Sequence, residues 1–345
     1  MLISIVITNH NYAEYLGDAI ESAIDQDYPH TEVIVVDDGS DDDSISVIRK
    51  FGDRINPLFK DRGGQCSCLN AAFFASRGDA IIFLDADDIL LPTAASLHAR
   101  HLANGAVKSC GYMNVVDADG RCLGRRVPMQ MARSGHYLRD TLRHGLDTVQ
   151  TSFTSGHAWS RDFLKLVLPL PEDDTIGPDG YLTAIDSLFG RLEFIHSPVA
   201  LYRRHGRNKG PSRFRFEASY MKDRLARRRH RIRYAEEWMR RLAFEPDTRR
   251  LREIGDWRLL LMQHCLWLMG EDEERPSIRE IAMVPLRNGR DRLWSRTWIS
   301  AALLLVRLLP AVASLYTARI ILDRTQLSRG RQVNNIDRGI VTAVR

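Results

Sequence analysis

The stretch Gly78-Asp-Ala-Ile-Ile-Phe-Leu-Asp-Ala-Asp-Asp-Ile-Leu90 decides how this chain folds. Its residues 80–84 form a short, continuous apolar run, which is typical of a strand buried on both faces of a parallel sheet. The run stops at Asp85-Ala-Asp-Asp88, and three carboxylates cannot share an apolar interior without a cation or dense hydrogen bonding. In an open α/β sheet, ligands bind at the carboxyl ends of the strands. The stretch therefore predicts a strand that ends in a polar site.

The spacing of Asp85 and Asp87 suggests that this site holds a metal ion. Two hard oxygen ligands placed close together suit Mg2+ or Mn2+ carrying a substrate phosphate, with Asp88 supporting them. The alternative is a polar loop in which Asp88 caps a helix that begins after Pro92. Asp-x-Asp is a short pattern and does not decide between the two by itself.

The N-terminal part of the chain alternates strands with helices. Strands are expected at 3–7, 32–36, 55–59 and 80–84, and helices at 12–24, 45–51 and 64–77. This order, with short connections, predicts an α/β fold with a right-handed, mostly parallel sheet covered by helices on both faces. The polar groups that follow the first, second and fourth strands would then meet at one edge of the sheet.

Composition and charge narrow the possible partners. The 345 residues can bury a core and hold one large or two smaller domains. The chain begins with a strand pattern and no secretory signal is expected, and five cysteines without metal-ligand spacing favour free thiols in a reducing, cytoplasmic compartment. Residues 1–190 carry 16 Lys and Arg against 27 Asp and Glu, a net charge of −11, whereas residues 191–345 carry 33 against 17, a net charge of +16. The basic part needs an anionic partner, which is a membrane surface, nucleic acid or a phosphorylated substrate.

Further along, residues 109–116 and 122–127 indicate a hairpin. Its turn, Asp117-Ala-Asp-Gly120, resembles the opening of a calcium loop but lacks the later acidic ligands, which favours a plain turn. The segment Gly177-Pro-Asp-Gly-Tyr-Leu182 begins a predicted helix that ends near residue 189. A predicted strand at 198–202 then leads into Tyr202-Arg-Arg-His-Gly-Arg-Asn208.

Several of these motifs occur in a recognisable order. The early ones are Val6-Ile-Thr-Asn-His-Asn-Tyr12, Glu32-Val-Ile-Val-Val-Asp-Asp-Gly-Ser40, Gly63-Gly-Gln65 with Asn70-Ala-Ala72, and Phe83-Leu-Asp-Ala-Asp-Asp88. In this order they resemble the family 2 glycosyltransferases of the GT-A fold, and the segments 179–182 and 202–208 resemble the acceptor-side motifs of that family. Several ordered motifs are more specific than any single one. The resemblance covers about residues 1–210 and leaves out the last third of the chain.

The resemblance implies an organisation and a chemistry. Residues 1–210 would form a GT-A domain, a Rossmann-like sheet flanked by helices, and residues 211–345 would form a helical, Arg-rich C-terminal region. The donor would be a nucleotide-diphosphate sugar, with a UDP-sugar favoured. The cofactor would be Mn2+ or Mg2+, since a cation stabilises the charge that develops on a diphosphate leaving group. Transfer to an acceptor hydroxyl would invert the anomeric carbon.

The resemblance also implies roles for residues at the donor site. Asp87 would be the leading metal ligand, and Asp85 would contact the donor ribose or reach the metal through water. Asp38 would read the nucleotide base. The other implied donor contacts are Thr8, Asn11, Tyr12, Asp37, Gln65, Asn70 and Arg204. The start of the helix at Gly64 would favour phosphate through its dipole.

Inversion needs a base on the face of the sugar opposite the leaving group. Asp179 is the predicted catalytic base. Pro178 stands where the family more commonly has Glu, and this departure leaves Asp173 and Asp174 as alternatives.

His205 resembles a family position that reaches the metal ion or the diphosphate, and we predict it as a second metal ligand. The neighbouring arginines, Arg203, Arg204 and Arg207, suggest phosphate contacts.

The last third of the chain is basic and helical. A long Arg-rich helix is predicted within residues 214–242 and further helices within 249–269, with too few interleaved aromatic residues to favour nucleic acid. In residues 294–322 the central Arg307 argues against a spanning helix. We predict amphipathic helices lying at a membrane interface, with Trp294 and Trp298 at headgroup level. The alternative is a helical pair that packs on this protein or on a second copy in a homo-oligomer.

Together these features predict an inverting glycosyltransferase at the inner face of the membrane that acts on a lipid-linked or polymeric carbohydrate acceptor. One alternative is a sugar-phosphate nucleotidyltransferase, which would want a Gly-rich, Arg-bearing loop in place of residues 8–12. The other is a catalytically silent homologue acting as a binding or scaffold module, which the departure at Pro178 keeps open.

Overall fold

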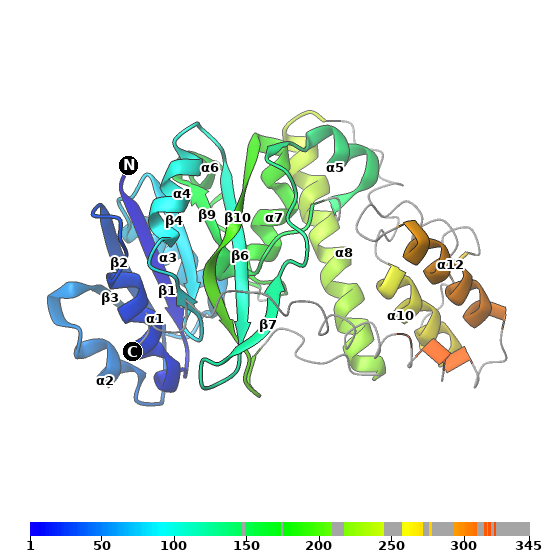
Figure 1. Cartoon of the computed structure of the whole chain (residues 1–345), viewed down its shortest axis with the longest axis horizontal. Coiled ribbons are helices and arrows are strands. Elements are labelled where there is room, and N and C mark those ends of the chain that lie inside the picture. The colour runs from blue at the N-terminus through cyan, green and yellow to red at the C-terminus, as the bar shows by residue number, and fades with distance from the viewer. Residues whose placement is uncertain are drawn as a thin grey trace.

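The computed structural model describes residues 1–146, 149–173, 175–208, 217–244, 257–271, 276–277 and 293–308, with 314–315, 317–318 and 321. Its main feature is a ten-stranded sheet with the strand order β3-β2-β1-β4-β9-β6-β10-β5, in which β7 pairs with β6 and β8 with β10 (Figure 1). The strands are β1 (Ile3–Asn9), β2 (Thr31–Asp38), β3 (Asn56–Lys60), β4 (Ala80–Asp85), β5 (Ile89–Leu90), β6 (Lys108–Val116), β7 (Cys122–Val127), β8 (Gly135–His136), β9 (His157–Ser160) and β10 (Arg191–Arg203).

The helices alternate with these strands in the first part of the chain and dominate the last part. They are α1 (Ala13–Ile24), α2 (Ser44–Arg49), α3 (Gly64–Ala75), α4 (Ala94–Leu102), α5 (Leu138–His144), α6 (Arg161–Val167), α7 (Pro178–Phe189), α8 (Ala218–Arg241), α10 (Trp257–Leu268) and α12 (Leu293–Leu308). Two short 3-10 turns, η1 (Gly52–Arg54) and η3 (Thr154–Gly156), also occur.

Strands β1 to β4 run parallel, as the order of the sequence patterns predicts. In register, Ile5 lies opposite Val33 of β2 on one side and Ile82 of β4 on the other. The same register sets Thr8 opposite Asp85, so the ends of these strands meet at one edge. The predicted α/β fold is therefore confirmed, and the polar strand ends are brought together by the parallel pairing itself.

The first strands are buried on both faces because consecutive side chains of a strand point to opposite sides. Ile5 and Ile7 belong to a core that α1, α2 and α4 cover. Val6, between them, belongs to a second core that α3, α6, α7 and α8 cover. This is why the strands are continuous apolar runs rather than alternating ones.

The second half of the sheet is mixed. Strand β9, which no sequence pattern predicted, is antiparallel to both β4 and β6 and lies between them. Strand β10 then pairs parallel to β6, with register shifts around Pro198, and antiparallel to β5. The predicted mostly parallel arrangement thus holds for β1 to β4, and β9 makes the whole sheet mixed.

Helix α8 connects the sheet to the C-terminal helices (Figure 1). Ile232, Ala235 and Met239 complete the core that includes α7, whereas Met221 and Leu225 pack in a third core with α10 and α12. The long basic helix predicted from the sequence is therefore fixed on two sides.

One face of α12 packs on protein, whereas Leu308 at its end is exposed. Leu303 and Val306 are buried in the third core, and Ser300 is buried as well. For these buried residues the packing alternative holds, and membrane contact of residues 294–322 stays a prediction. The side chains of Trp294, Trp298 and Arg307 lie outside the described residues. Within the described part of the chain, no helix combines the length and the apolar character needed to cross a membrane.

Candidate active site

A cavity of about 570 Å³ opens at the carboxyl ends of the parallel strands. Cavities of this size are typical of small-molecule and cofactor sites. Its walls come from β1, β2, β4, β10, α3, η3, α7, α8 and the loops between them. The residues used below that line it are Thr8, Tyr12, Asp38, Gln65, Asp85, Asp87, Phe153, Gly177, Asp179, Tyr202, Gly206, Asn208, Tyr220, Asp223, Arg224 and Arg227.

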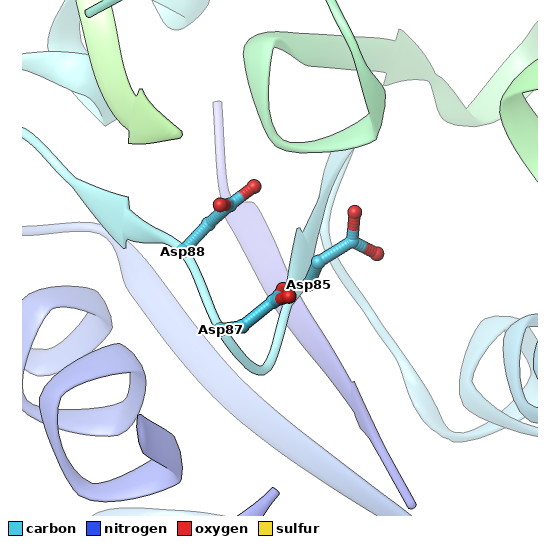
Figure 2. A group of neighbouring side chains, drawn as sticks. All are labelled: Asp85, Asp87 and Asp88. Atoms are coloured by element: carbon cyan, nitrogen blue, oxygen red, sulfur yellow. The ribbon is translucent and has the colours of Figure 1, made fainter. Parts of the chain in front are cut away.

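Three carboxylates gather in the turn between β4 and β5. One oxygen each of Asp85, Asp87 and Asp88 lies within 4.8 Å of the others. Figure 2 shows the three side chains projecting to the same side of this turn. They lie together because strand β4 ends at Asp85 and the chain reverses at once into the two-residue strand β5.

Asp88 is the buried member of this cluster and does not cap a helix. Its Oδ2 accepts a hydrogen bond from Ser155 Oγ at 2.6 Å, and its Oδ1 accepts one from the backbone amide of Arg203 at 3.0 Å. Burial and the neighbouring carboxylates of Asp87 and Asp85 raise the pKa of Asp88 well above its usual range. The helix-capping alternative is wrong, because β5 intervenes and Thr93 occupies the cap position of α4.

Asp87 is held from the side of β10. His205 Nε2 lies 2.9 Å from Asp87 Oδ2, and Asn208 Nδ2 donates to the same oxygen at 3.2 Å. The His205 ring stacks on Tyr15, with ring centroids 4.8 Å apart. The structure therefore brings His205 to the acidic cluster, where it contacts a carboxylate, and its role as a metal ligand remains a prediction.

The donor set of the cluster fits a divalent cation. Three carboxyl groups within 4.8 Å repel one another unless a cation or protons compensate them, and carboxylate oxygens are the ligands that Mg2+ and Mn2+ prefer. Asp85 and Asp87 face the cavity, whereas Asp88 is buried behind them. Asp85 and Asp87 would therefore hold the cation where a ligand in the cavity can reach it.

Asp179 lies in the first turn of α7, on the wall of the same cavity. A Cβ atom added at Gly177 would be 3.1 Å from Asp179 Oδ1 and 3.7 Å from Gln65 Oε1, so the two side chains approach each other across this glycine. Gln65 Nε2 in turn donates to Asp85 Oδ1 at 2.6 Å. Burial raises the pKa of Asp179, and the guanidinium of Arg231 partly opposes this shift. The predicted base and the acidic cluster thus share one cavity.

The two alternative bases differ from Asp179 in position. Asp173 accepts a hydrogen bond from Tyr181 Oη at 2.5 Å and lies 3.5 Å from His230 Nε2. It does not line the cavity, and these contacts tie the loop before α7 to α8. Asp174 lies outside the described residues.

Several predicted donor contacts do line the cavity, namely Thr8, Tyr12, Asp38, Gln65 and Asp85. Burial, with Asp87 and Asp85 adding to it, raises the pKa of Tyr12 to about 12, which places this phenol close to the acidic cluster. Asp38 accepts hydrogen bonds from Lys60 Nζ and from the amides of Gly63 and Gly64, each at 2.8 Å. Its carboxylate therefore accepts two amides at the start of α3, and the preference of this helix start for phosphate stays a prediction. Asp38 still faces the cavity, and its contact with the base remains a prediction.

Four predicted donor contacts do not line the cavity; Arg204 is one, and the other three hold loops together. Asn11 exchanges two hydrogen bonds with Asp41, at 2.6 and 2.9 Å. Asp37 is buried and accepts from Asn9 Nδ2 and from Ser40. The amide of Asn70 bonds to the backbone of residue 170 and to Glu172. Their side-chain polar groups are hydrogen-bonded within the protein, so the structure gives no support to donor contacts at these positions.

The arginines beside His205 also have structural partners. Arg203 is buried and donates to the carbonyls of Asp87 and Ala118 and to Asp18 Oδ2. Arg207 pairs with Glu14 at 2.8 Å. Arg204 extends the pairing of β10 with β6 through its backbone and does not line the cavity. The predicted phosphate contacts of these three residues are therefore not supported.

Sequence reasoning missed other residues of the site. Ser155 bonds both Asp88 and the backbone of Asp85, and the rings of Phe153 and Tyr202 pack 4.8 Å apart on the cavity wall. No local pattern marks Ser155 or Phe153, because they reach the site only through β9. Three residues of α8, Tyr220, Arg224 and Arg227, also line the cavity. The positive charge of the two arginines was the only signal available in the sequence.

The fold and the cavity define an α/β protein with a ligand site at the strand ends, and comparisons with known proteins give its class. Residues 4–164 match the family described as glycosyl transferase family 2. An uncharacterized glycosyltransferase of Nostoc sp. is 31% identical over 218 residues, which are 60% of this chain and 66% of that protein. The chain thus spans just under two thirds of the length of this relative.

Solved structures agree in fold. The S. aureus protein TarS, in complex with UDP-GlcNAc, has a TM-score of 0.52 at 18% identity, with 98% of this chain and 94% of that chain covered. The mannosyltransferase PcManGT from Pyrobaculum calidifontis, in complex with GDP-Man and Mn2+, has a TM-score of 0.51 at 17% identity, with 95% and 83% covered. Likeness at such low identity shows the fold alone.

Residues 4–164 thus match glycosyl transferase family 2, and the fold is that of the GT-A glycosyltransferases. The family resemblance found in the sequence is confirmed for this segment.

Proposed function

We propose that this protein is an inverting glycosyltransferase that transfers a sugar from a nucleotide-diphosphate donor to an acceptor hydroxyl. The observation that carries the proposal is that the acidic cluster and Asp179 face one cavity, linked by Gln65 and Gly177. Two relatives in fold are described with nucleotide-sugars, UDP-GlcNAc and GDP-Man, which supports a donor of this class.

In the proposed reaction, the acceptor oxygen bonds to the anomeric carbon while the bond from that carbon to the diphosphate breaks. Asp179 takes the proton of the acceptor hydroxyl, and its raised pKa makes it a stronger base than an ordinary aspartate. Thr8, Tyr12 and Asp38 would bind the nucleotide, with uridine favoured. Asp85 and Asp87 would hold Mn2+ or Mg2+, which neutralises the leaving diphosphate when bound.

The departure from the family at Pro178 has a structural explanation. Pro178 is the first residue of α7, a position where the fixed φ of proline suits a helix and its missing N–H costs no bond. The proline is therefore compatible with an active site that uses Asp179. Nothing in the described cavity favours the nucleotidyltransferase alternative.

The proposal is tested by thermal unfolding of the full chain with UDP-, GDP- and ADP-sugars, with and without Mn2+, since ligands stabilise the state that they bind. We expect one nucleotide class to raise Tm only with Mn2+, and Asp87→Ala to remove this shift. Asp119→Ala, which removes a carboxylate in the turn between β6 and β7, is the matched control and should keep it. Binding without transfer or donor hydrolysis would favour the silent binding module, and no binding at all would contradict both.

We also propose that the basic part of the chain holds the enzyme at the cytoplasmic face of a membrane, near a lipid-linked or polymeric carbohydrate acceptor. The net charge of +16 on residues 191–345 supports this. Since Leu303 and Val306 of α12 are buried, we expect charge rather than insertion of these side chains to provide the attraction. Co-sedimentation with phosphatidylglycerol vesicles, but not with phosphatidylcholine vesicles, is the expected result. Equal binding to both, or binding that salt does not weaken, would contradict it.

A further inference from the structure

One face of the basic helix α8 forms part of the cavity wall. Tyr220, Arg224, Arg227 and Arg231 are spaced four, three and four residues apart, which sets them on one face of a helix. The first three line the cavity. The apolar residues of α8 pack on the sheet and on the C-terminal helices, so the orientation of this face is fixed.

This face of α8 begins near Asp179, the proposed catalytic base, and extends away from it along the helix axis. Arg231 Nε donates to the carbonyl of Gly180 at 3.3 Å, directly after Asp179 in α7. At 1.5 Å per residue, Arg227 lies about 6 Å and Arg224 about 10 Å further along the axis of α8. A molecule whose hydroxyl reaches Asp179 would therefore meet these two arginines along its length.

The charges of the two arginines are available to a ligand. Arg224 is half-buried, and the part of the chain that the structure describes offers it no hydrogen bond or ion pair. Arg227 pairs with Asp223 at 2.8 Å, but both side chains are about half exposed, and exposed pairs of this kind are weak. The carboxylates elsewhere on the wall have other partners, since Asp38 bonds to Lys60 and Asp85 to Gln65. A bound anion would therefore find one cation, Arg224, without an ion pair among the described residues, and a second, Arg227, whose exposed pair with Asp223 is weak enough to exchange.

We propose that this face of α8 is the acceptor subsite, and that the acceptor carries a phosphate group within about two helical turns, or 11 Å, of the hydroxyl that is glycosylated. The inference rests on the proposed glycosyl transfer and deepens it. The planar guanidinium groups of Arg224 and Arg227 match the geometry of phosphate oxygens, and the ring of Tyr220 offers a flat apolar surface to a sugar. The phosphate could belong to a lipid-linked sugar or to a soluble phosphorylated carbohydrate.

The test uses the full chain saturated with UDP and Mg2+, or with the nucleotide class that the thermal-unfolding panel selects, so that the donor phosphate site is already filled. Glucose 1-phosphate is titrated as the soluble phosphate probe, and methyl glucoside is its neutral counterpart. Phosphatidylcholine vesicles with or without polyprenyl diphosphate form the lipid arm. We expect the wild-type protein to bind at least one phosphate probe in preference to its neutral counterpart. Preference for the vesicles alone would identify a lipid source, and preference for glucose 1-phosphate alone a soluble one.

Two double variants distinguish binding at this subsite from a general effect of the positive charge of α8. In R224A/R227A we expect phosphate-probe affinity to fall about tenfold or more, because hydrogen bonds to charged groups are lost. R233A/R240A removes the same charge from exposed positions of α8 that do not line the cavity and should retain the affinity within about twofold. Nucleotide affinity should be unchanged in both variants.

Three results would overturn the inference. They are no preference for phosphate in the wild-type protein, an equal loss in R233A/R240A, and a loss of nucleotide affinity in R224A/R227A, which would assign the arginines to the donor diphosphate. Metal-dependent nucleotide binding by the wild-type protein is measured in the same samples. If that binding is intact while the phosphate probes fail, the acceptor subsite is wrong and the glycosyltransferase proposal stands.

Discussion

The substitution Gly177→Ala tests whether the carboxyl group of Asp179 must stay where the structure holds it. The added Cβ would be 3.1 Å from Asp179 Oδ1, closer than ordinary van der Waals contact, and the carboxylate would have to move by a few tenths of an ångström. That oxygen also accepts a hydrogen bond from the backbone amide of Gly180 at 2.8 Å. Gly177 has φ −68° and ψ 167°, which alanine adopts without strain, so the substitution acts on the site and not on the backbone.

The size of the effect follows from the displacement. Misplacing a reacting group by 1 Å costs about 100-fold in rate, so a shift of a few tenths of an ångström corresponds to about a 4- to 10-fold loss in kcat. Gln65 Oε1 would be at 3.7 Å, an ordinary van der Waals contact, and no atom of Thr8, Tyr12 or Asp38 lies within 4 Å of the added Cβ. Nucleotide affinity should therefore not change. Stability should fall by about 1 kcal/mol, since glycine is preferred to alanine at a helix N-cap.

The assay is steady-state donor turnover, with nucleotide affinity measured in parallel. Gly206→Ala is the matched control, because Gly206 lines the same cavity but a Cβ there would have nothing within 4 Å. We expect Gly206→Ala to behave as the wild-type protein. A kcat for Gly177→Ala within about twofold of wild type would refute the reasoning that Asp179 must be held in place, and so would an equal loss in both variants.

Two further predictions concern stability. Lys108 and Asp186 form a buried ion pair at 2.5 Å, so Lys108→Met should lower the free energy of unfolding by about 3–5 kcal/mol in urea titrations, and adding Asp186→Leu should recover most of it. If the double variant is no more stable than the single one, the loss came from packing. Burial lowers the pKa of His98 from 6.5 to about 3 and that of His157 well below its usual range. The unfolded chain binds these protons first, so stability is complete above about pH 6.5 and falls by up to about 1.4 kcal/mol per histidine for each pH unit below it. His157→Phe should reduce the difference in unfolding free energy between about pH 7 and pH 5, and an unchanged difference would exclude this histidine as its source.

The fold of the first part of the chain could be predicted because its signals are local. Continuous apolar runs such as residues 80–84 indicate strands covered on both sides, and helical spacing between them indicates the covering helices. Parallel pairing then brings the ends of β1, β2 and β4 to one edge without further information. Strand β9 was missed because its four residues are too short to show a period.

The roles of single side chains were harder to predict because distant contacts decide them. Asp37 and Asp38 are neighbours in β2, yet Asp37 bonds to Asn9 inside the scaffold and Asp38 faces the cavity. Consecutive residues of a strand point to opposite sides, but the sequence does not say which side holds the ligand. The sequence likewise suggests Arg203 as a phosphate ligand, because it does not show that this side chain bonds to Asp18, 185 residues away.

The sequence by itself determined the α/β order, the acidic turn after β4 and the basic character of the C-terminal part, since each depends on residues close together in the chain. Only the tertiary structure decided that Asp179 and a face of α8 join that turn in one cavity, and that Asn70 and Arg203 serve the scaffold instead. The physical reason is that a polar side chain bonds to whichever partner the packed chain brings within reach, and a buried one must find such a partner.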